Sequence, residues 1–140
     1  MINIKKTAVL FSFLFIALNI NAQSPVGVWK IISHTFVYDG QKIDSHAALL
    51  KQRPCAAQIV WEINTDGTFR LNATTSGCED SYKKIQEKLY SKTQWKYVKN
   101  IFTTSATNFT VGQSYTVVFS GKKMIMTGTE GQGTIIYQKL

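Results

Sequence analysis

Hydrophobic and polar residues alternate along short runs of this chain, and the alternation is clearest near the middle. The run 57–64 places an apolar residue at every second position, and the run 68–73 does the same after an Asp66-Gly67 pair. A period of two is the spacing of side chains on one face of a β-strand, and Asp-Gly is typical of a tight hairpin turn. These runs therefore predict a hairpin with one buried face and one face in water.

Further runs rich in Val, Ile, Thr, Tyr, Phe and Trp follow, separated by turn residues. The strands expected outside the first hairpin are 26–38, 41–47, 93–98, 101–104 with an extension toward 109, 114–120, 123–128 and 134–139. The chain is thus expected to be an all-β single domain of eight or nine antiparallel strands. Such a sheet avoids exposed edges by closing into an up-and-down barrel or by packing as two layers, and periodicity does not choose between these solutions.

One segment has a different period. Between residues 79 and 91, Tyr82, Ile85 and Leu89 recur at helical spacing, with lysines on the other faces. This pattern predicts one short amphipathic helix that packs on the strands through these three side chains. Alternative roles for the lysine-rich helix are a lid over one end of the domain or a surface for an anionic partner.

The first 22 residues form a segment of their own. Lys5 and Lys6 precede an apolar run over 8–18, and a small residue, Ala22, follows it. This layout is typical of a secretory signal peptide, and the apolar run is short for a membrane span. We therefore expect cleavage near Ala22 and a secreted or periplasmic domain over 23–140 with no transmembrane span in the mature chain.

Cys55 and Cys78 both lie in the expected mature chain. Export places them in an oxidising compartment, where a disulfide between them is favoured. A zinc site is the rival interpretation, but the two cysteines are far apart and lack Cys-x-x-Cys spacing. The sequence therefore predicts a disulfide and no metal site.

The charge balance is basic. Without Lys5 and Lys6, the chain has 14 basic and 8 acidic residues, a balance of +6. A basic surface suits anionic partners in general. Nucleic acid is not expected among them, because an exported protein rarely meets it.

Several features, in their order along the chain, resemble the short bacterial lipocalin-like domain. They are Gly27-x-Trp29, the first cysteine, the hairpin from Trp61 to Phe69, the second cysteine, Trp95-Lys96 and the closing strand 135–139. The resemblance spans nearly all of the mature chain and implies a single 8–9-stranded up-and-down β-barrel, lipocalin-like, with Trp29 at its floor. The chain departs from better-known lipocalins by having Lys139, and no arginine, on its last strand. An ammonium group stacks less well than a guanidinium group on the opening tryptophan.

The motifs of common enzymes are missing from this sequence: no nucleophile elbow, phosphate-binding loop or metal-ligand cluster is visible. We therefore expect a protein that is not an enzyme and has no cofactor. His34, within the first strand, is expected to be a packed or surface residue. His46 stands close to Asp44, but a pair of this kind is common and does not predict a catalytic base.

Large apolar side chains fall on the face assigned to the barrel interior. They are Trp61, Phe69, Trp95, Tyr97, Tyr115, Val117, Phe119, Met124 and Met126. In a wide barrel they would line a pocket, and in a narrow one they would fill the core. The leading hypothesis is a monomer that binds a small hydrophobic or amphipathic molecule inside the barrel. The alternative is a surface-acting binding or inhibitor module of the cell envelope with a solidly packed barrel.

Overall fold

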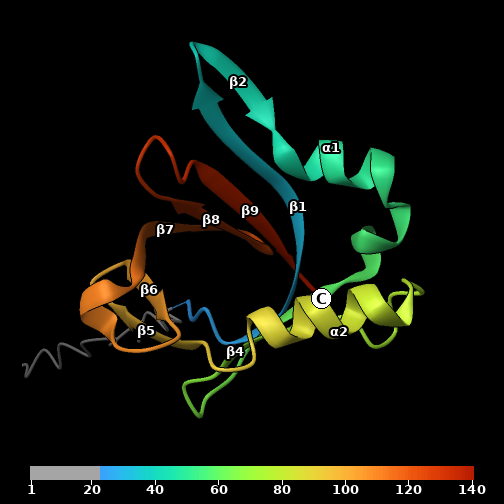
Figure 1. Ribbon diagram of the computed structural model, residues 1–140. Helices are drawn as coiled ribbons and strands as arrows, with labels where there is room; N and C mark the ends of the chain where they lie inside the picture. The colour runs from blue at the N-terminus through green and yellow to red at the C-terminus, as the bar shows by residue number, and fades with distance from the viewer. Residues whose placement is uncertain (1–22) are drawn as a thin grey trace, which may run out of the picture.

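The structure is a computed structural model that describes residues 23–140 (Figure 1). The expected signal peptide and its cleavage site near Ala22 lie outside the described residues. Within 23–140, no helix combines the length and the apolar character needed to cross a membrane.

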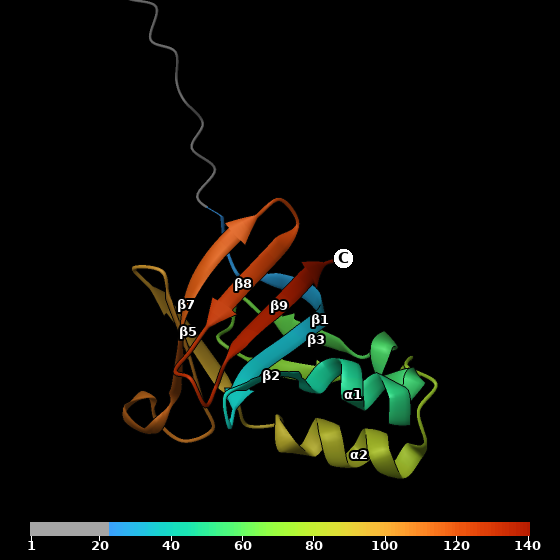
Figure 2. The same cartoon turned by 90° about the horizontal axis from the view of Figure 1, so that it is seen from above.

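Eight strands form one antiparallel barrel, as the sequence predicts (Figures 1 and 2). In order around the barrel they are β4 (Phe69–Asn72), β3 (Val60–Ile63), β1 (Gly27–Tyr38), β9 (Thr134–Lys139), β8 (Lys123–Thr127), β7 (Gln113–Ser120), β6 (Ile101–Ser105) and β5 (Gln94–Val98). A ninth strand, β2 (Gln41–Asp44), pairs only with the far end of β1. A single curled sheet, and not a two-layer sandwich, therefore protects the strand edges.

The barrel closes at two places of unequal strength. The first strand pairs with the last over a long register that runs from Trp29 opposite Lys139 to Thr35 opposite Thr134. On the other side, β4 and β5 meet through one bridge, Thr68 opposite Gln94. There, the backbone N–H of Phe69 donates to the Thr93 carbonyl, and that of Trp95 donates to the Gly67 carbonyl, both at 3.0 Å.

Arginine and tryptophan side chains reinforce this short seam. Nη1 of Arg70, on β4, donates to the carbonyl of Thr93 at 2.6 Å and to that of Tyr90 at 3.2 Å. Nε1 of Trp95, on β5, donates to the carbonyl of Asn64 at 2.9 Å. The barrel is therefore nearly closed all round, with side chains bridging the seam where few backbone bonds cross.

The described residues contain two α-helices, although the sequence analysis expects only one. Helix α1 (Ser45–Gln52) replaces the end of the strand expected over 41–47, because the Asp44 carboxylate caps it by accepting from the N–H of Ala47 at 3.0 Å. A 3₁₀ helix, η1 (Pro54–Gln58), then delays the strand expected from residue 57 until Val60. Proline favours such a helical start because its fixed φ suits the first helical position.

A second short helix ends the extension expected beyond residue 104. β6 stops at Ser105, and η2 (Phe109–Val111) follows. Asn108 caps η2 by accepting from the N–H of Thr110 at 3.0 Å. Residues toward 109 therefore turn away from the barrel and add nothing to the strand.

Helix α2 (Asp80–Leu89) lies where the sequence predicts a helix, but with a different face on the barrel. Ile85 and Leu89 are 59% and 63% exposed, so the expectation that they pack inward is wrong. Tyr82 packs inward, with the Arg53 guanidinium 3.8 Å from its ring centroid. Glu87 also faces the barrel and accepts from the N–H of Ala73 at 3.0 Å. Because Glu87 is polar, the spacing of apolar residues could not identify it as a contact with the barrel. The same spacing wrongly assigned Ile85 and Leu89 to that contact.

The half of the barrel nearest the start of β1 is filled by its own side chains. Trp29 is only 2% exposed, and its Nε1 donates to the Pro25 carbonyl at 2.9 Å. Nζ of Lys139 lies 5.5 Å from the centroid of the same indole ring. Ile63 and Met124 are buried in the same core cluster. Side chains therefore fill the interior of the barrel at this end.

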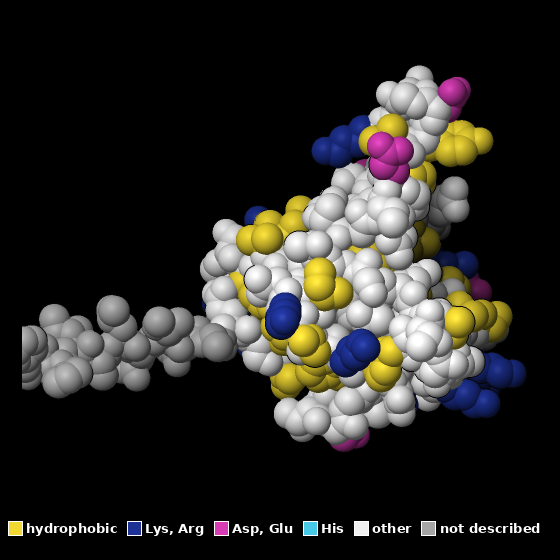
Figure 3. Space-filling view, turned by 90° about the vertical axis from the view of Figure 1, so that its left-hand side faces the viewer, with side chains coloured by type: hydrophobic (Ala, Val, Ile, Leu, Met, Phe, Trp, Pro, Cys, Tyr) yellow, Lys and Arg dark blue, Asp and Glu magenta, His cyan; other side chains and the backbone are white. Residues whose placement is uncertain are grey.

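The hairpin of β1 and β2 projects beyond the barrel, and its tip carries charged and hydrophobic side chains (Figure 3). Asp39 and Gly40 turn the chain with φ values of 49° and 72°, the positive values of a type I′ turn. Val37 and Tyr38, next to this turn, are exposed. The hairpin thus extends the wall of the barrel on the side where α1 begins.

The cysteines form the disulfide that the sequence predicts. Cys55 in η1 is bonded to Cys78, which comes just before α2, across a sequence separation of 23 residues. The bond ties the segment that contains α1 to the segment that leads into α2. Both helices lie on the same side of the barrel (Figure 2).

Replacing both cysteines, Cys55→Ser with Cys78→Ser, is expected to lower the free energy of unfolding by about 3 kcal/mol. In the chain-entropy model, a closed loop of this length restricts the unfolded state by that amount. Chemical denaturation of the oxidised wild type and the double variant measures the difference. Reduced wild type serves as the control and should match the variant; equal stability of all three proteins would contradict the expectation.

Candidate functional site

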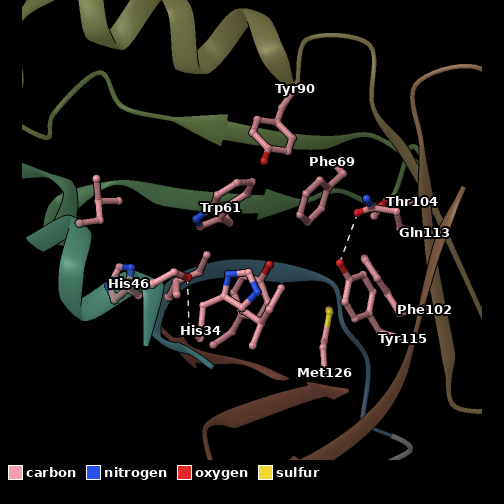
Figure 4. A pocket seen from close by; sticks show the side chains of 15 residues that line it. His34, His46, Trp61, Phe69, Tyr90, Phe102, Thr104, Gln113, Tyr115 and Met126 are labelled. Atoms are coloured by element: carbon pink, nitrogen blue, oxygen red, sulfur yellow. Dashed lines mark hydrogen bonds between the residues drawn. The ribbon is translucent and has the colours of Figure 1, made fainter. Parts of the chain in front are cut away.

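The barrel is hollow in the half next to α1, where a cavity of about 300 Å³ remains (Figure 4). Its walls come from β1, β3, β4 and from β6 to β9. Helix α1 and Tyr90, the residue after α2, complete the lining. One end of the barrel is therefore packed and the other is open enough to receive a molecule.

Most of the cavity wall is apolar. The apolar lining residues are Ile31, Leu49, Trp61, Phe69, Phe102, Met126 and Ile135. The indole of Trp61 is central among the aromatic rings, with its centroid 5.4 Å from that of Phe69 and 4.7 Å from that of Tyr90. Aromatic faces and a flexible methionine suit an apolar molecule of irregular shape.

Three tyrosines add hydroxyl groups to this apolar wall: Tyr90, Tyr115 and Tyr137. The hydroxyl of Tyr115 donates to Oε1 of Gln113 at 3.3 Å. Within residues 23–140, neither the Tyr90 hydroxyl nor the Tyr137 hydroxyl has a hydrogen-bond partner. Two phenolic groups thus reach the cavity with their hydrogen-bonding capacity unused by the described chain.

Burial keeps these phenols protonated. It raises the pKa of Tyr90, Tyr115 and Tyr137, and for Tyr137 the rise is very large. Tyr90 also raises the pKa of Tyr115, and both of them raise the pKa of Tyr137, since a charge on one phenol disfavours a second charge in this apolar space. Each therefore retains its proton, which it can donate, across the whole biological pH range.

The mouth of the cavity is more polar than its interior. It carries Ser45, His46, Thr104 and Gln113 from α1, β6 and β7. His34, on β1, also lines the cavity, and its Nε2 is 2.9 Å from the Gln132 carbonyl oxygen. Because a carbonyl only accepts, this nitrogen must carry the proton, which orients the ring. Polar groups at the rim keep their access to water, so they do not close the cavity.

A close backbone contact places that carbonyl. Gly133 has a φ of 72°, and a Cβ there would lie 2.0 Å from the carbonyl oxygen of Thr35 on β1. Only glycine fits such an approach. The turn between β8 and β9 can therefore press against β1 and bring Gln132 to His34.

His46 and Asp44 are close in the sequence, but their pKa values are lowered by different causes. Burial lowers the pKa of His46, and the Asp44 carboxylate offsets part of this effect. The pKa of Asp44 is lowered chiefly by the hydrogen bond from the N–H of Ala47. His46 is therefore neutral at pH 7, and Asp44 is ionised as a helix cap.

A smaller hollow of about 70 Å³ adjoins the cavity. It lies beneath the helices against Ala56, Ile59 and Leu71, and shares Ile31, His46, Leu49 and Trp61 with the main cavity. The shared residues make the wall between the two spaces.

The structure brings together four of the nine side chains that the sequence analysis assigned to a pocket. Trp61, Phe69, Tyr115 and Met126 line the cavity. Val117 and Met124 are buried in the packed core, where they support the walls. The alternating pattern correctly predicted that these side chains point into the barrel. It did not predict which of them lie at the end that contains the cavity.

The remaining three side chains serve other contacts. Trp95 stacks on Phe102 at 5.7 Å between centroids, behind the cavity wall and at the seam with β4. Tyr97 lies edge-on to Phe119 at 6.4 Å, and its hydroxyl donates to Oδ1 of Asn100 at 3.2 Å. None of the three lines the cavity.

Other lining residues were missed. Phe102, Ile135 and Tyr137 lie on expected strands and point inward, so alternation along β6 and β9 could have identified them. His46 and Leu49 gave no such signal, because they belong to α1 and the sequence pattern predicts no helix there.

Charged chemistry is sparse at this site. Within the described chain, no group of three or more His, Cys, Asp or Glu residues could hold a metal ion. The cavity lining contains no Lys, Arg, Asp or Glu among residues 23–140. The polar part of the lining therefore consists of hydroxyl, amide and imidazole groups.

The stability of the protein should depend on pH through His46. Its folded pKa is below the ordinary value of 6.5, so the unfolded chain takes the proton first as pH falls. The free energy of unfolding is thus expected to decrease from about pH 7 to pH 5, and His46→Gln should reduce this decrease. Urea unfolding at both pH values measures it. Asp44 titrates at lower pH, and an unchanged slope in the variant would contradict the assignment.

The chain was compared with models of protein families, with curated proteins and with solved structures, and none of the three comparisons found a match.

Proposed function

We propose that this protein binds a small hydrophobic or amphipathic molecule inside its barrel. The observation that carries the proposal is the cavity of about 300 Å³ at one end of an otherwise packed interior. Ligand sites are concave, mostly apolar and supplied with a few polar groups. This cavity has all three properties.

The volume limits the size of the ligand. An engineered apolar cavity of about 150 Å³ holds one benzene molecule. The space here is about 300 Å³, so a molecule of two fused rings or a short branched chain fits. Long lipids would have to extend out of the mouth.

Access to the cavity runs past α1. His46 and Leu49 line the cavity and are partly exposed, so they stand between the interior and solvent. The helix is fixed at its start by the Asp44 cap. A ligand would therefore enter with small side-chain movements and without unfolding of the barrel.

The proposal includes a site of action outside the cytoplasm. The disulfide between Cys55 and Cys78 agrees with an oxidising compartment. The layout of residues 1–22 as a leader and the resemblance to lipocalin-like domains point the same way. We infer that the protein is a secreted or periplasmic carrier or scavenger.

A fluorescent apolar probe tests the proposal. N-phenyl-1-naphthylamine should bind the wild type with enhanced emission, and Thr104→Phe, which adds a ring to the cavity, should weaken binding roughly tenfold or more. Val118→Phe is the matched control, because it adds the same ring at an exposed position of β7. Circular dichroism checks that both variants fold.

Two results would oppose the proposal. The first is a wild type that gives no probe signal after extraction of any co-purified lipid. The second is a folded Thr104→Phe variant that binds the probe as tightly as Val118→Phe does.

A second candidate function acts through the outer face of α2. Ile85 and Leu89 are exposed there beside the exposed Lys84 and Lys88. Lysines around an exposed apolar pair suit an anionic lipid surface. Lys83 is excluded from this set, because its Nζ lies 3.7 Å from Asp80 and donates to the Thr74 carbonyl.

Vesicle sedimentation tests this candidate. Lys84→Gln with Lys88→Gln should reduce binding to vesicles rich in phosphatidylglycerol by roughly thirtyfold, at about 1 kcal/mol per lysine. Lys42→Gln with Lys123→Gln is the control, since it makes the same charge change on β2 and β8. Equal losses in both pairs would indicate general charge attraction and would rule out a specific role for α2.

A further inference from the structure

We propose that the cavity is built for an uncharged molecule that carries a hydrogen-bond acceptor, such as a carbonyl oxygen, on an apolar body. The acceptor would be held by the hydroxyls of Tyr137 and Tyr90. This inference rests on the proposed function, which it narrows to one class of ligand.

Tyr137 supplies the first observation. It is 4% exposed on β9, within the packed wall of the barrel. Its hydroxyl has no hydrogen-bond partner in residues 23–140. In that part of the chain, every side-chain nitrogen or oxygen that is sealed from solvent does have a partner. The hydroxyl must therefore open onto the cavity. Buried polar groups almost always have a partner, so this one needs a partner inside the cavity.

Tyr90 supplies the second observation. It comes from the other side of the barrel, after α2, and Figure 4 shows its hydroxyl pointing into the cavity. The indole of Trp61 packs near both phenols, with its centroid 4.7 Å from that of the Tyr90 ring and 6.5 Å from that of the Tyr137 ring, edge-on to both. Two hydroxyls thus reach into the space in front of one aromatic wall.

Within residues 23–140, no side chain around these two hydroxyls forms a hydrogen bond with them. Trp61, Phe69 and Met126 are the apolar groups around them. Tyr115 differs, because its hydroxyl already donates to Gln113 at the mouth. Each phenol has one proton to donate. An oxygen acceptor on the ligand would satisfy Tyr137, and could be shared with Tyr90.

The absence of formal charge in the lining among residues 23–140 argues against an ionised ligand. A carboxylate taken out of water needs a paired cation, and an ammonium group needs an anion. His34 and His46 are the two lining groups that could become cations. Nε2 of His34 is already bonded to the Gln132 carbonyl, and burial favours neutral His46 by lowering its pKa. The Asp44 carboxylate, at the start of α1, would also repel an anion.

Three probes with one naphthalene body test the inference. 2-Acetylnaphthalene has a neutral acceptor, 2-ethylnaphthalene has none, and 2-naphthoate is an anion at pH 7.5. Each is titrated into the full mature protein by calorimetry or by displacement of N-phenyl-1-naphthylamine. In the wild type, 2-naphthoate should bind at least about tenfold more weakly than the ketone, because its charge finds no partner.

The variant Tyr137→Phe isolates the hydroxyl. The ratio of ketone affinity to hydrocarbon affinity should fall about fivefold, the value of one neutral hydrogen bond, while hydrocarbon affinity stays within about twofold. Tyr90→Phe should lower the same ratio and serves if Tyr137→Phe does not fold. Tyr97→Phe is the matched control, since its hydroxyl bonds to Asn100 outside the cavity, and its ratio should match the wild type.

The outcomes separate this inference from the proposed function. If no probe binds the wild type, the proposed function fails. If the hydrocarbon binds but neither Tyr137→Phe nor Tyr90→Phe changes the ratio, the ligand class is wrong and the cavity function stands. Tightest binding of 2-naphthoate would also overturn the ligand class.

Discussion

The pairing of β1 with β9 is the contact on which the whole domain depends, because it joins the first strand of the barrel to the last. It runs from Trp29 opposite Lys139 to Thr35 opposite Thr134, and β1 pairs with β3 along its other edge. The remaining strands follow each other as hairpins and need no such long-range closure, except at the seam between β4 and β5. An interior exists only because these two edges meet.

Closure by itself does not make a binding site, since a barrel of eight strands can be filled by its own side chains. Here the filling is uneven. Trp29, Ile63 and Met124 pack one half, whereas residues at the other end of the same strands stand further apart around the cavity. Helix α1 lies at the rim of that open half and replaces strand pairing with a partly exposed, polar mouth. The packed half gives the walls rigidity, and the open half provides the space.

The chemistry of the cavity follows from what is buried there. The phenols of Tyr90, Tyr115 and Tyr137 remain neutral because burial disfavours their ionised form. The described lining holds no formal charge that could balance an ionised ligand. This chemistry is what supports the proposed ligand, an apolar body with a neutral polar group. The basic face of α2 is a separate feature on the outside of the barrel.

The sequence by itself determined the features that depend on neighbours along the chain. Alternation and the Asp66-Gly67 turn predicted the β3–β4 hairpin, the two cysteines predicted the disulfide, and inward positions such as Trp61 and Met126 followed from a period of two. Only the tertiary structure decided which inward residues face empty space, since Met124 and Met126 have the same pattern and different surroundings. It also decided that Glu87, and not Ile85 or Leu89, joins Tyr82 in the contact of α2 with the barrel, and that α1 brings His46 to the mouth. These outcomes depend on contacts between segments that are distant in the sequence. A local pattern of polarity does not specify which distant segment packs against a given side chain.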